Sequence, residues 1–407
     1  MTEHNLPLAV TPIEHEEDET ALRAIATQTF DFPEDNWEGF VEVVGRENLR
    51  IARSGEKVVG GMCFYPVKQW FGGKSIPSAA IALVCIAPEL RGQGYATDML
   101  NAFLRQQGNE GYPLATLYAS TVNFYRNLNF EHAGNSYTYS CSLDDIKGCK
   151  PVLPMRSVET SPTNALFEAI STKRAEFENG HIERNEGMWK RICRADGRSK
   201  VYSYVVGDPG EEVGYLVYDQ KRNPGRSAAA DQSFEQRILQ VRDMVALNEK
   251  AMETIWSFIK GHGTVKDMVQ WNGSASDARM MVLSEYEPRV PVPSRWMLRM
   301  WDARQALALR GYPNIDVDLP LALDDELNQE NTGQFTLSVH AGEAEIVPGV
   351  QADPIHIKVR DLASLYSGFY RAERLEQYGK LTCNTPETVE KASALFHGEE
   401  PWMPDRF

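Results

Sequence analysis

The chain has 407 residues, enough for two or three domains that each form a hydrophobic core. Its formal net charge of −15 argues against nonspecific nucleic-acid binding, which depends on Lys and Arg, and favours a cationic small-molecule partner, although an acidic surface can also serve solubility alone. No apolar run approaches the roughly 20 residues that span a bilayer, and Met1–Asn5 lacks signal-peptide features, so we expect a cytoplasmic protein with no membrane partner.

The pattern up to residue 150 predicts one α/β unit. A helix is expected around Leu22 and Ile25, followed by an aromatic and acidic loop from Phe30 to Trp37. This loop could bind a cation through its rings and carboxylates, or it could be a surface loop with one packed tryptophan. Strands are then predicted at Leu49–Arg53, Lys57–Pro66, Ala79–Ala87 and Leu114–Ala119.

The segment from Leu83 to Ala96 combines an apolar strand with a basic, glycine-rich turn. Apolar residues recur with helical spacing as far as Leu104, so an amphipathic helix begins where the glycines end. Gly92 and Gly94 allow the backbone to approach a ligand, and Arg91 adds charge to a helix N-terminus that already favours anions. The pattern therefore predicts a phosphate-binding turn, and it matches neither a dinucleotide fingerprint nor a Walker A loop.

From residue 151 to 294 the chain has a related layout without the glycine-rich turn. A strand at Arg237–Leu247 leads to a helix that Asn248 could cap, and Asp219–Gln232 is expected to be an exposed, mobile loop. Prolines 288, 291 and 293 indicate a boundary near residue 295. An unrelated strand and helix would give the same pattern.

The last segment, from 295 to 407, predicts an α+β domain. Trp296–Trp301 enters it, and its opening helix is expected to end at Gly311. Alternating apolar residues from Phe335 to Val339 predict a strand that turns at Ala341–Gly342, and Thr385-Pro386 starts a last helix.

Arg91, Gly94 and Ala96 occupy the fixed positions of Arg/Gln-x-x-Gly-x-Gly/Ala, so the turn resembles the pyrophosphate loop of the GNAT superfamily of N-acetyltransferases. With the segment Phe124–Phe130 and a mixed domain that ends at Phe407, the whole chain resembles the Eis-like acetyltransferases. The resemblance implies a mixed α/β (α+β) architecture. Two fused GNAT domains, 1–150 (catalytic) and 151–294 (without a cofactor loop), would precede a sterol-carrier-protein-like domain, 295–407.

The resemblance implies acetyl-CoA as co-substrate and direct transfer, in a ternary complex, to an amine on an aminoglycoside, a polyamine or a lysine-like acceptor. It implies a homohexamer as well. The main chain of Val84, Cys85 and Ile86 would bind the pantetheine arm. Ser120 and Thr121 would lie where strands splay to admit the thioester, and the pyrophosphate would be held by Arg91, Gly92, Gln93, Gly94, Tyr95, Ala96 and Thr97.

Two proton-handling groups follow from the same resemblance. Tyr125 would be the general acid that protonates the departing thiolate, since a phenol with a pKa of about 10 can supply a thiol of about 8.5. The carboxylate of Phe407 would be the general base. Packing or CoA binding alone is the other interpretation of Tyr125, and Asn129 stands where many GNAT sequences have glycine. Phe32, Asp35 and Trp37 would border the acceptor, although Arg406 would disfavour a cationic one.

Two other functions fit the sequence. One is an acyl-CoA or lipid sensor with an inactive GNAT unit and an apolar ligand in the third domain; the other is a longer-chain acyltransferase, since N-myristoyltransferases also join tandem GNAT units to a catalytic C-terminus. Tyr125 and the complete loop favour the acetyltransferase. The six cysteines and the histidines lack metal-ligand spacing, so we expect reduced thiols and no metal.

Overall fold

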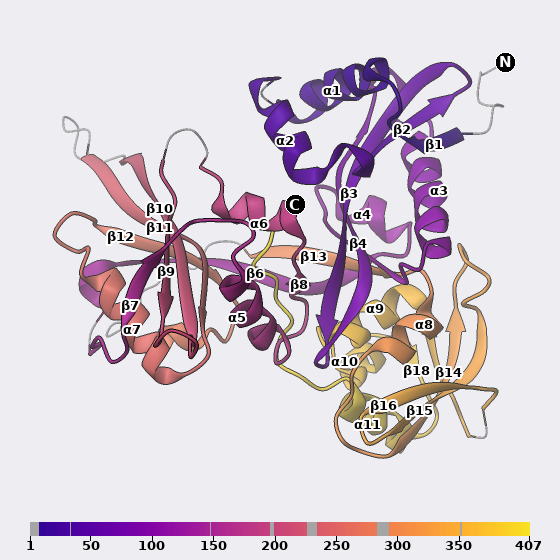
Figure 1. The fold of residues 1–407 in the computed structure, drawn as a ribbon. Coiled ribbons are helices and arrows are strands. Elements are labelled where there is room, and N and C mark those ends of the chain that lie inside the picture. The colour runs from indigo at the N-terminus through magenta and orange to yellow at the C-terminus, as the bar shows by residue number, and fades with distance from the viewer. Residues whose placement is uncertain are drawn as a thin grey trace.

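The computed structural model describes residues 8–32, 34–146, 148–195, 199–225, 234–282, 293–350 and 352–407. Within them the chain forms three units: the first from β1 to β6, the second from β7 to η5, and the third from α8 to the end (Figure 1). The architecture is mixed α/β, as the sequence predicts.

The first unit contains the predicted helix and strands. Its helices are α1 (Glu16–Phe30), α2 (Trp37–Val44), α3 (Tyr95–Asn109) and α4 (Val122–Arg126), with short turns of 3-10 helix at η1 (Glu34–Asn36), η2 (Arg46–Asn48), η3 (Pro88–Leu90) and η4 (Leu143–Asp145). Its strands are β1 (Leu8–Pro12), β2 (Leu49–Ser54), β3 (Lys57–Phe71), β4 (Lys74–Ile86), β5 (Leu114–Tyr118) and β6 (Glu131–Ser142). β3 and β4 are longer than predicted because they form one extended hairpin that turns at Gly72 and Gly73, both with positive φ.

The second unit has helices α5 (Ala165–Ala175), α6 (Glu186–Cys193), α7 (Glu249–Lys260) and η5 (Ala278–Val282). Its strands are β7 (Met155–Val158), β8 (Ile182–Glu183), β9 (Tyr202–Val206), β10 (Gly214–Gly225), β11 (Phe234–Ala246) and β12 (Met268–Gly273). The predicted helix cap is confirmed, since the Asn248 side chain accepts a hydrogen bond from the Ala251 amide. The loop predicted at 219–232 is wrong in its first part. β10 continues to Gly225, and Asp219 is buried because it pairs with Arg242; residues 226–232 lie outside the described part.

One sheet runs through the first two units, in the order β1-β2-β3-β4-β5-β13-β6-β12-β11-β10-β9-β7. β6 joins the halves, since Glu131–Ser136 pairs with β13 (Ser294–Met300) and Tyr137–Ser142 pairs with β12. Residues 296–301 lead into the predicted opening helix (Ala303–Leu309), but the sequence does not predict that Trp296–Met300 is itself a strand in the large sheet. The side chains of this strand are buried because both of its faces are covered. A continuous apolar run does not distinguish a buried strand from a buried helix. Prolines 288 and 291 lie outside the described residues.

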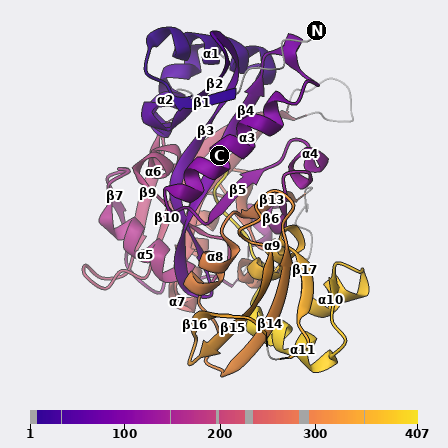
Figure 2. The same ribbon diagram turned by 90° about the vertical axis from the view of Figure 1, so that its right-hand side faces the viewer.

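The third unit contains α8 (Ala303–Leu309), α9 (Val359–Ser367), α10 (Ala372–Gln377) and α11 (Pro386–Leu395). Its five-stranded sheet has the order β16-β15-β14-β17-β18, built from β14 (Val317–Asp324), β15 (Gly333–His340), β16 (Glu343–Pro348), β17 (Ile355–Lys358) and β18 (Leu381–Thr382). The turn at Ala341–Gly342 and the helix after Thr385 are confirmed. α9 packs against β6 and β13 (Figure 2), and this contact fastens the third unit to the large sheet.

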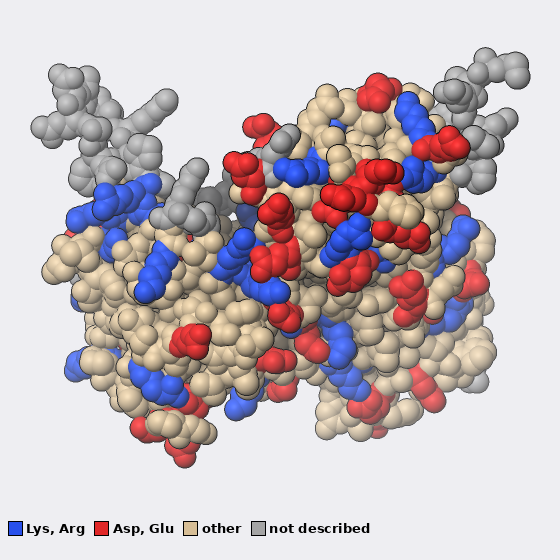
Figure 3. All heavy atoms as spheres, turned by 45° about the horizontal axis from the view of Figure 1, so that its top comes forward, with Lys and Arg blue, Asp and Glu red and all other residues tan. Residues whose placement is uncertain are grey.

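Residues 401–407, here called the tail, return from the third unit and end between the first two units (Figure 1). Acidic side chains are spread over the first unit, with basic ones among them at its seam with the second (Figure 3). All six cysteines are free thiols. Within the described ranges, no helix is long and apolar enough to cross a membrane.

Candidate active site

The turn between β4 and α3 has the features that the sequence predicts for an anion site. Gly92 and Gly94 adopt φ of 75° and 91°, a region that L side chains rarely enter. A Cβ atom at either position would meet no other heavy atom within 4 Å, so the space beyond both glycines is open. No side chain caps the N-terminus of α3, which leaves the helix dipole facing this space. In the second unit, the corresponding junction between β11 and α7 is capped by Asn248.

The other residues of this turn divide between the surface and the core. Arg91 is exposed, and its guanidinium donates to Thr29 Oγ1 at 3.0 Å. Gln93 and Thr97 are exposed and Ala96 is half-buried, whereas the Tyr95 ring packs in the core. The turn therefore offers backbone and one arginine to a ligand, while Tyr95 anchors α3.

β4 and β5 separate beside this turn. They pair in parallel only from Ser78–Ile81 against Leu114–Leu117, while β5 keeps its partner β13 on the other side. Leu83 has a φ of 55°, rare for a branched residue, and the β3–β4 register shifts next to it. The backbone from Val84 to Ile86 therefore has no strand partner on the β5 side among the described residues, and this separation of β4 from β5 is called the opening below.

Ser120 and Thr121 are exposed just after the end of β5, where the sequence predicts them. Cys85 is buried on the strand that borders the opening, and its thiol donates to the Gly61 carbonyl at 3.5 Å. Burial raises the pKa of this thiol to about 12. Cys85 is therefore protonated at neutral pH and is a poor nucleophile.

Tyr125 lies on α4 between the rings of Phe124 and Phe130, at centroid distances of 4.9 and 5.8 Å. Its side chain is largely buried, and this desolvation raises the pKa of the phenol to about 12. Desolvation alone accounts for this shift, and no hydrogen bond to the hydroxyl contributes to it. The hydroxyl thus keeps its proton at neutral pH and has it available for donation.

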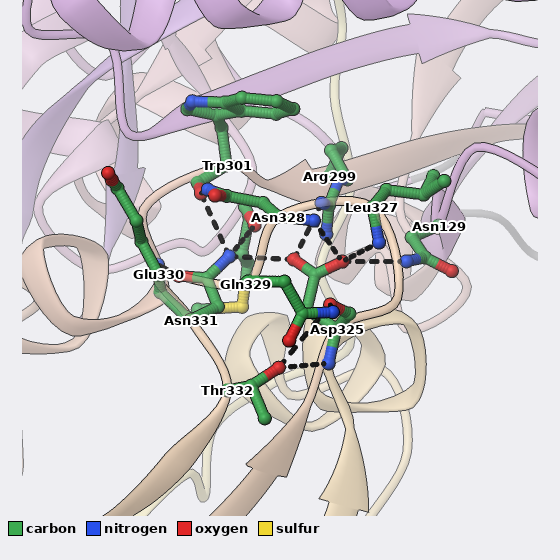
Figure 4. A network of polar contacts seen from close by, with 12 residues as sticks. Asn129, Arg299, Trp301, Asp325, Leu327, Asn328, Gln329, Glu330, Asn331 and Thr332 are labelled. Atoms are coloured by element: carbon green, nitrogen blue, oxygen red, sulfur yellow. Dashed lines mark hydrogen bonds and ion pairs between the residues drawn. The ribbon is translucent and has the colours of Figure 1, made fainter.

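The turn after Tyr125 is held by the third unit (Figure 4). Asn129 adopts a φ of 60°, which asparagine tolerates better than other non-glycine residues, so the turn forms without the usual glycine. Its side-chain amide donates to Asp325 Oδ1 at 2.9 Å. Asp325 is completely buried and also accepts hydrogen bonds from Arg299 Nη2 at 2.7 Å and Asn331 Nδ2 at 2.8 Å. Asp325 is not predictable from the sequence alone, and the one signal for it is Asn129 at a position where many GNAT sequences have glycine.

The tail is docked over its length. The Trp402 amide donates to the Asn179 carbonyl at 3.1 Å, and its indole donates to Glu178. Asp405 is buried and accepts from Arg184 Nε at 2.8 Å, while its carbonyl accepts from the Tyr118 hydroxyl at 2.9 Å. These contacts fix the last residues against the end of β5.

Phe407 packs between Tyr65 and Tyr118, at ring-centroid distances of 6.1 and 5.7 Å. It lines a cavity of about 580 Å³ together with the end of β5 and Val122, the first residue of α4. The structure therefore brings the last residue, the helix that carries Tyr125 and the opening after β5 to one region. This cavity is called the terminal cavity below.

The three residues predicted to border an acceptor form an aromatic cluster. Trp37 is buried, and its indole donates to Glu19 Oε1 at 3.0 Å. Phe32 is half-buried and meets Trp37 edge to face at 6.1 Å, while Asp35 is exposed. The Trp37 ring faces the core here, so contact of these residues with an acceptor stays a prediction.

Comparison with known families identifies three domains. Residues 12–133 and residues 180–300 each match an acetyltransferase (GNAT) domain, and residues 303–404 match a sterol carrier protein domain. Among the described residues, no group of three or more His, Cys, Asp and Glu side chains could hold a metal ion.

Relatives match over most of the chain. An uncharacterized N-acetyltransferase of Streptomyces griseus is 25% identical over 83% of this chain and 83% of its own length. N-acetyltransferase Eis of Mycobacterium tuberculosis is 22% identical, with 90% of this chain and 96% of that protein covered.

Solved structures extend the match in three dimensions. A GCN5-related N-acetyltransferase from Anabaena variabilis is 32% identical, with a TM-score of 0.92, and the match covers 98% of this chain and 100% of that one. Eis1 from Mycobacterium abscessus shares the fold, with a TM-score of 0.79 at 21% identity over 98% of this chain and 100% of its own.

Proposed function

Because this chain belongs to the GCN5-related N-acetyltransferases and is thereby an acyltransferase, we propose that it acetylates the amine of a small-molecule acceptor with acetyl-CoA. The observation that carries the proposal is the opening between β4 and β5, which leads into the uncapped N-terminus of α3 through two glycines with positive φ. This arrangement suits a long ligand with a pyrophosphate at one end and a thioester at the other.

In this proposal, acetyl-CoA adds to the exposed edge of β4. The backbone of Val84–Ile86 bonds the pantetheine arm, and the turn from Arg91 to Thr97 holds the pyrophosphate. The thioester then lies between the separated strands near Ser120 and Thr121. A binding site formed by main-chain groups requires open space beside the backbone rather than particular side chains. The open space beside Gly92 and Gly94 meets this requirement.

The reaction proceeds by direct attack in a ternary complex. The neutral amine nitrogen attacks the thioester carbonyl, a carbon–nitrogen bond forms and the carbon–sulfur bond breaks. The amine proton goes to the carboxylate of Phe407, directly or through water, and the thiolate takes the proton of Tyr125. Direct attack is favoured over a covalent intermediate because the nearby thiols of Cys63 and Cys85 are buried, and burial raises the pKa of both.

Several finer points rest on the resemblance to Eis-like enzymes. They are the acceptor class (an aminoglycoside, a polyamine or a lysine-like amine), its contacts with Phe32, Asp35 and Trp37, the homohexamer and the cytoplasmic location. The domain limits 1–150, 151–294 and 295–407 are proposals as well.

The test combines turnover with cofactor binding. Purified protein is mixed with acetyl-CoA and a panel of amines, and both thiol release and acetylated product are measured. Gly94→Asp should abolish acetyl-CoA binding in calorimetry because it places bulk and negative charge against the pyrophosphate. Gly111→Asp is the matched control, since Gly111 has a φ of 89° and equally open surroundings at the other end of α3. Unchanged acetyl-CoA affinity in Gly94→Asp would show that the cofactor binds elsewhere.

A further inference from the structure

A second cavity adjoins the tail. Its volume is about 380 Å³, and it is bounded by β10, β11 and β12 of the second unit and by residues 404–406. Arg406 lines both this cavity and the terminal cavity, so the two adjoin at the chain end. Five basic side chains line the second cavity, but only two acidic ones: Arg184, Arg191, Lys221, Arg242 and Arg406 against Asp219 and Asp405.

Two of the five cations are neutralised within the protein. Arg184 lies between Asp243, at 2.6 Å, and Asp405, at 2.8 Å. Arg242 pairs with Asp219 at 2.7 Å, and it also donates to backbone carbonyls at the C-terminal end of α6. Both acidic side chains that line the cavity are therefore already paired with an arginine.

The other three cations are not compensated. Arg191, Lys221 and Arg406 are exposed, and none has a carboxylate within 4 Å among the residues that the structure describes. Arg191 donates to the Tyr65 hydroxyl at 3.2 Å, and Arg406 lies 5.9 Å from the centre of the Tyr118 ring. Tyr65 and Tyr118 are the rings that hold Phe407, so Arg191 and Arg406 place positive charge beside the last residue.

The local charge is therefore opposite to that of the whole chain, whose net charge is −15 and whose first unit carries many acidic side chains (Figure 3). Three unpaired cations would repel an acceptor with several ammonium groups. They would attract a carboxylate or phosphate, for which Arg and Lys are the usual partners. They would also favour the neutral form of a neighbouring amine, which is the form that attacks the thioester.

We propose that the acceptor carries an acidic group beside its reacting amine, and that Arg191, Lys221 and Arg406 bind this group in the second cavity while the amine enters the terminal cavity. The inference rests on the proposed acetyltransferase function. It replaces the cationic acceptor expected from the net charge with an amine that carries a carboxylate or a phosphate.

The experiment uses pairs of amines that differ only in the acidic group: lysine with 1,5-diaminopentane, and phosphoethanolamine with ethanolamine. Thiol release gives kcat/KM for each amine with the full-length enzyme. Lys221→Met should lower kcat/KM for the preferred acidic member roughly tenfold or more, the scale of a lost charge-assisted hydrogen bond, and leave its partner unchanged or faster. Lys221→Arg should restore most of the loss. Lys57→Met, at an exposed lysine of the β2–β3 hairpin, is the control.

The outcomes separate the two proposals. Preference for the acid-free member in both pairs, or an equal loss for both members in Lys221→Met, would overturn the inference and leave the acetyltransferase intact. A fall in acetyl-CoA affinity in Lys221→Met would also overturn it, because the cations would then serve the cofactor phosphates. Absence of thiol release with every amine would instead reject the proposed function itself.

Discussion

Around Tyr125, the rings of Phe124 and Phe130 replace water, and this burial raises the pKa of the phenol to about 12. A raised pKa keeps the acid in its donating form throughout the physiological range, and the site gains this property from packing alone. The sequence shows Phe124 and Phe130 near Tyr125, but it identifies Tyr125 as the acid only through its family pattern, because the burial of the phenol depends on the fold. Gly92 and Gly94 are different, since their need for positive φ is local and the sequence is enough to predict it.

If Tyr125 is the acid, Tyr125→Phe should lower turnover by about 10² to 10⁴ while acetyl-CoA affinity changes little, because one hydroxyl is lost and the ring packing stays. Tyr112→Phe, which keeps the edge contact of that ring with Phe64, is the control. The pH profile gives a second readout. Because the acid must be protonated and its pKa is about 12, the parent enzyme should show no alkaline loss of kcat/KM from this group between pH 6 and pH 9. A variant within twofold of the parent would leave Tyr125 a packing residue.

At the scale of elements, the polar network around Asp325 joins the α4–β6 turn to the start of the loop after β14 (Figure 4). Asp325 and Arg299 are both completely buried, so each depends on the other for compensation. The partners of Asp325 include Asn129, which is 196 positions away in sequence. No local pattern could have predicted this contact. The missed strand β13 has a related cause, because its apolar run is compatible with a helix until its neighbours β5 and β6 are known.

Substitutions at Asn129 should separate the requirement for a positive φ from the contribution of the side-chain hydrogen bond to Asp325. Asn129→Gly keeps the positive φ and removes only the hydrogen bond to Asp325, so we expect a small loss in the free energy of unfolding, about 1–2 kcal/mol. Asn129→Ala adds the strain of an alanine at positive φ and should lose about 1 kcal/mol more. Urea denaturation of both variants measures the difference. If the two variants were equally stable, the positive φ would not explain why asparagine occupies this position.

At the scale of the molecule, one sheet and one tail connect the three units. β6 is shared by the two GNAT domains, β13 returns from the second to the sheet of the first, and the tail crosses back from the third. The sequence implies the order of the units through its resemblance, and the two aromatics and two prolines of Pro401–Phe407 favour a stiff, docked segment. It could not predict that Arg184 and Asn135 receive the tail, since these contacts depend on the assembled sheet. The same assembly gathers Arg191, Lys221 and Arg406, so the net charge is a poor guide to the charge of the site.

The position of the chain end makes the assignment of Phe407 testable without disturbing the core. One residue added after Phe407 would move the carboxylate by up to about 3.5 Å, enough to spoil proton abstraction. Deleting Phe407 would leave the carboxylate on Arg406, one residue short, and would remove the ring contacts with Tyr65 and Tyr118. Both changes should reduce turnover strongly. The melting temperature should change little, because Trp402 and the buried Asp405–Arg184 pair still hold the tail.

The comparison that decides this prediction is between the parent, the C-terminally extended enzyme and an enzyme with the same residue added at the N-terminus. If the Phe407 carboxylate is the base, the parent and the N-terminally extended enzyme should share one pH profile of kcat/KM, and the C-terminal variant should lose activity at every pH. The C-terminal variant loses activity because its terminal carboxylate, although still present, no longer lies beside the amine. Equal activity and equal profiles in all three would place the base elsewhere, and the exposed Asp35 would be the first carboxylate to substitute.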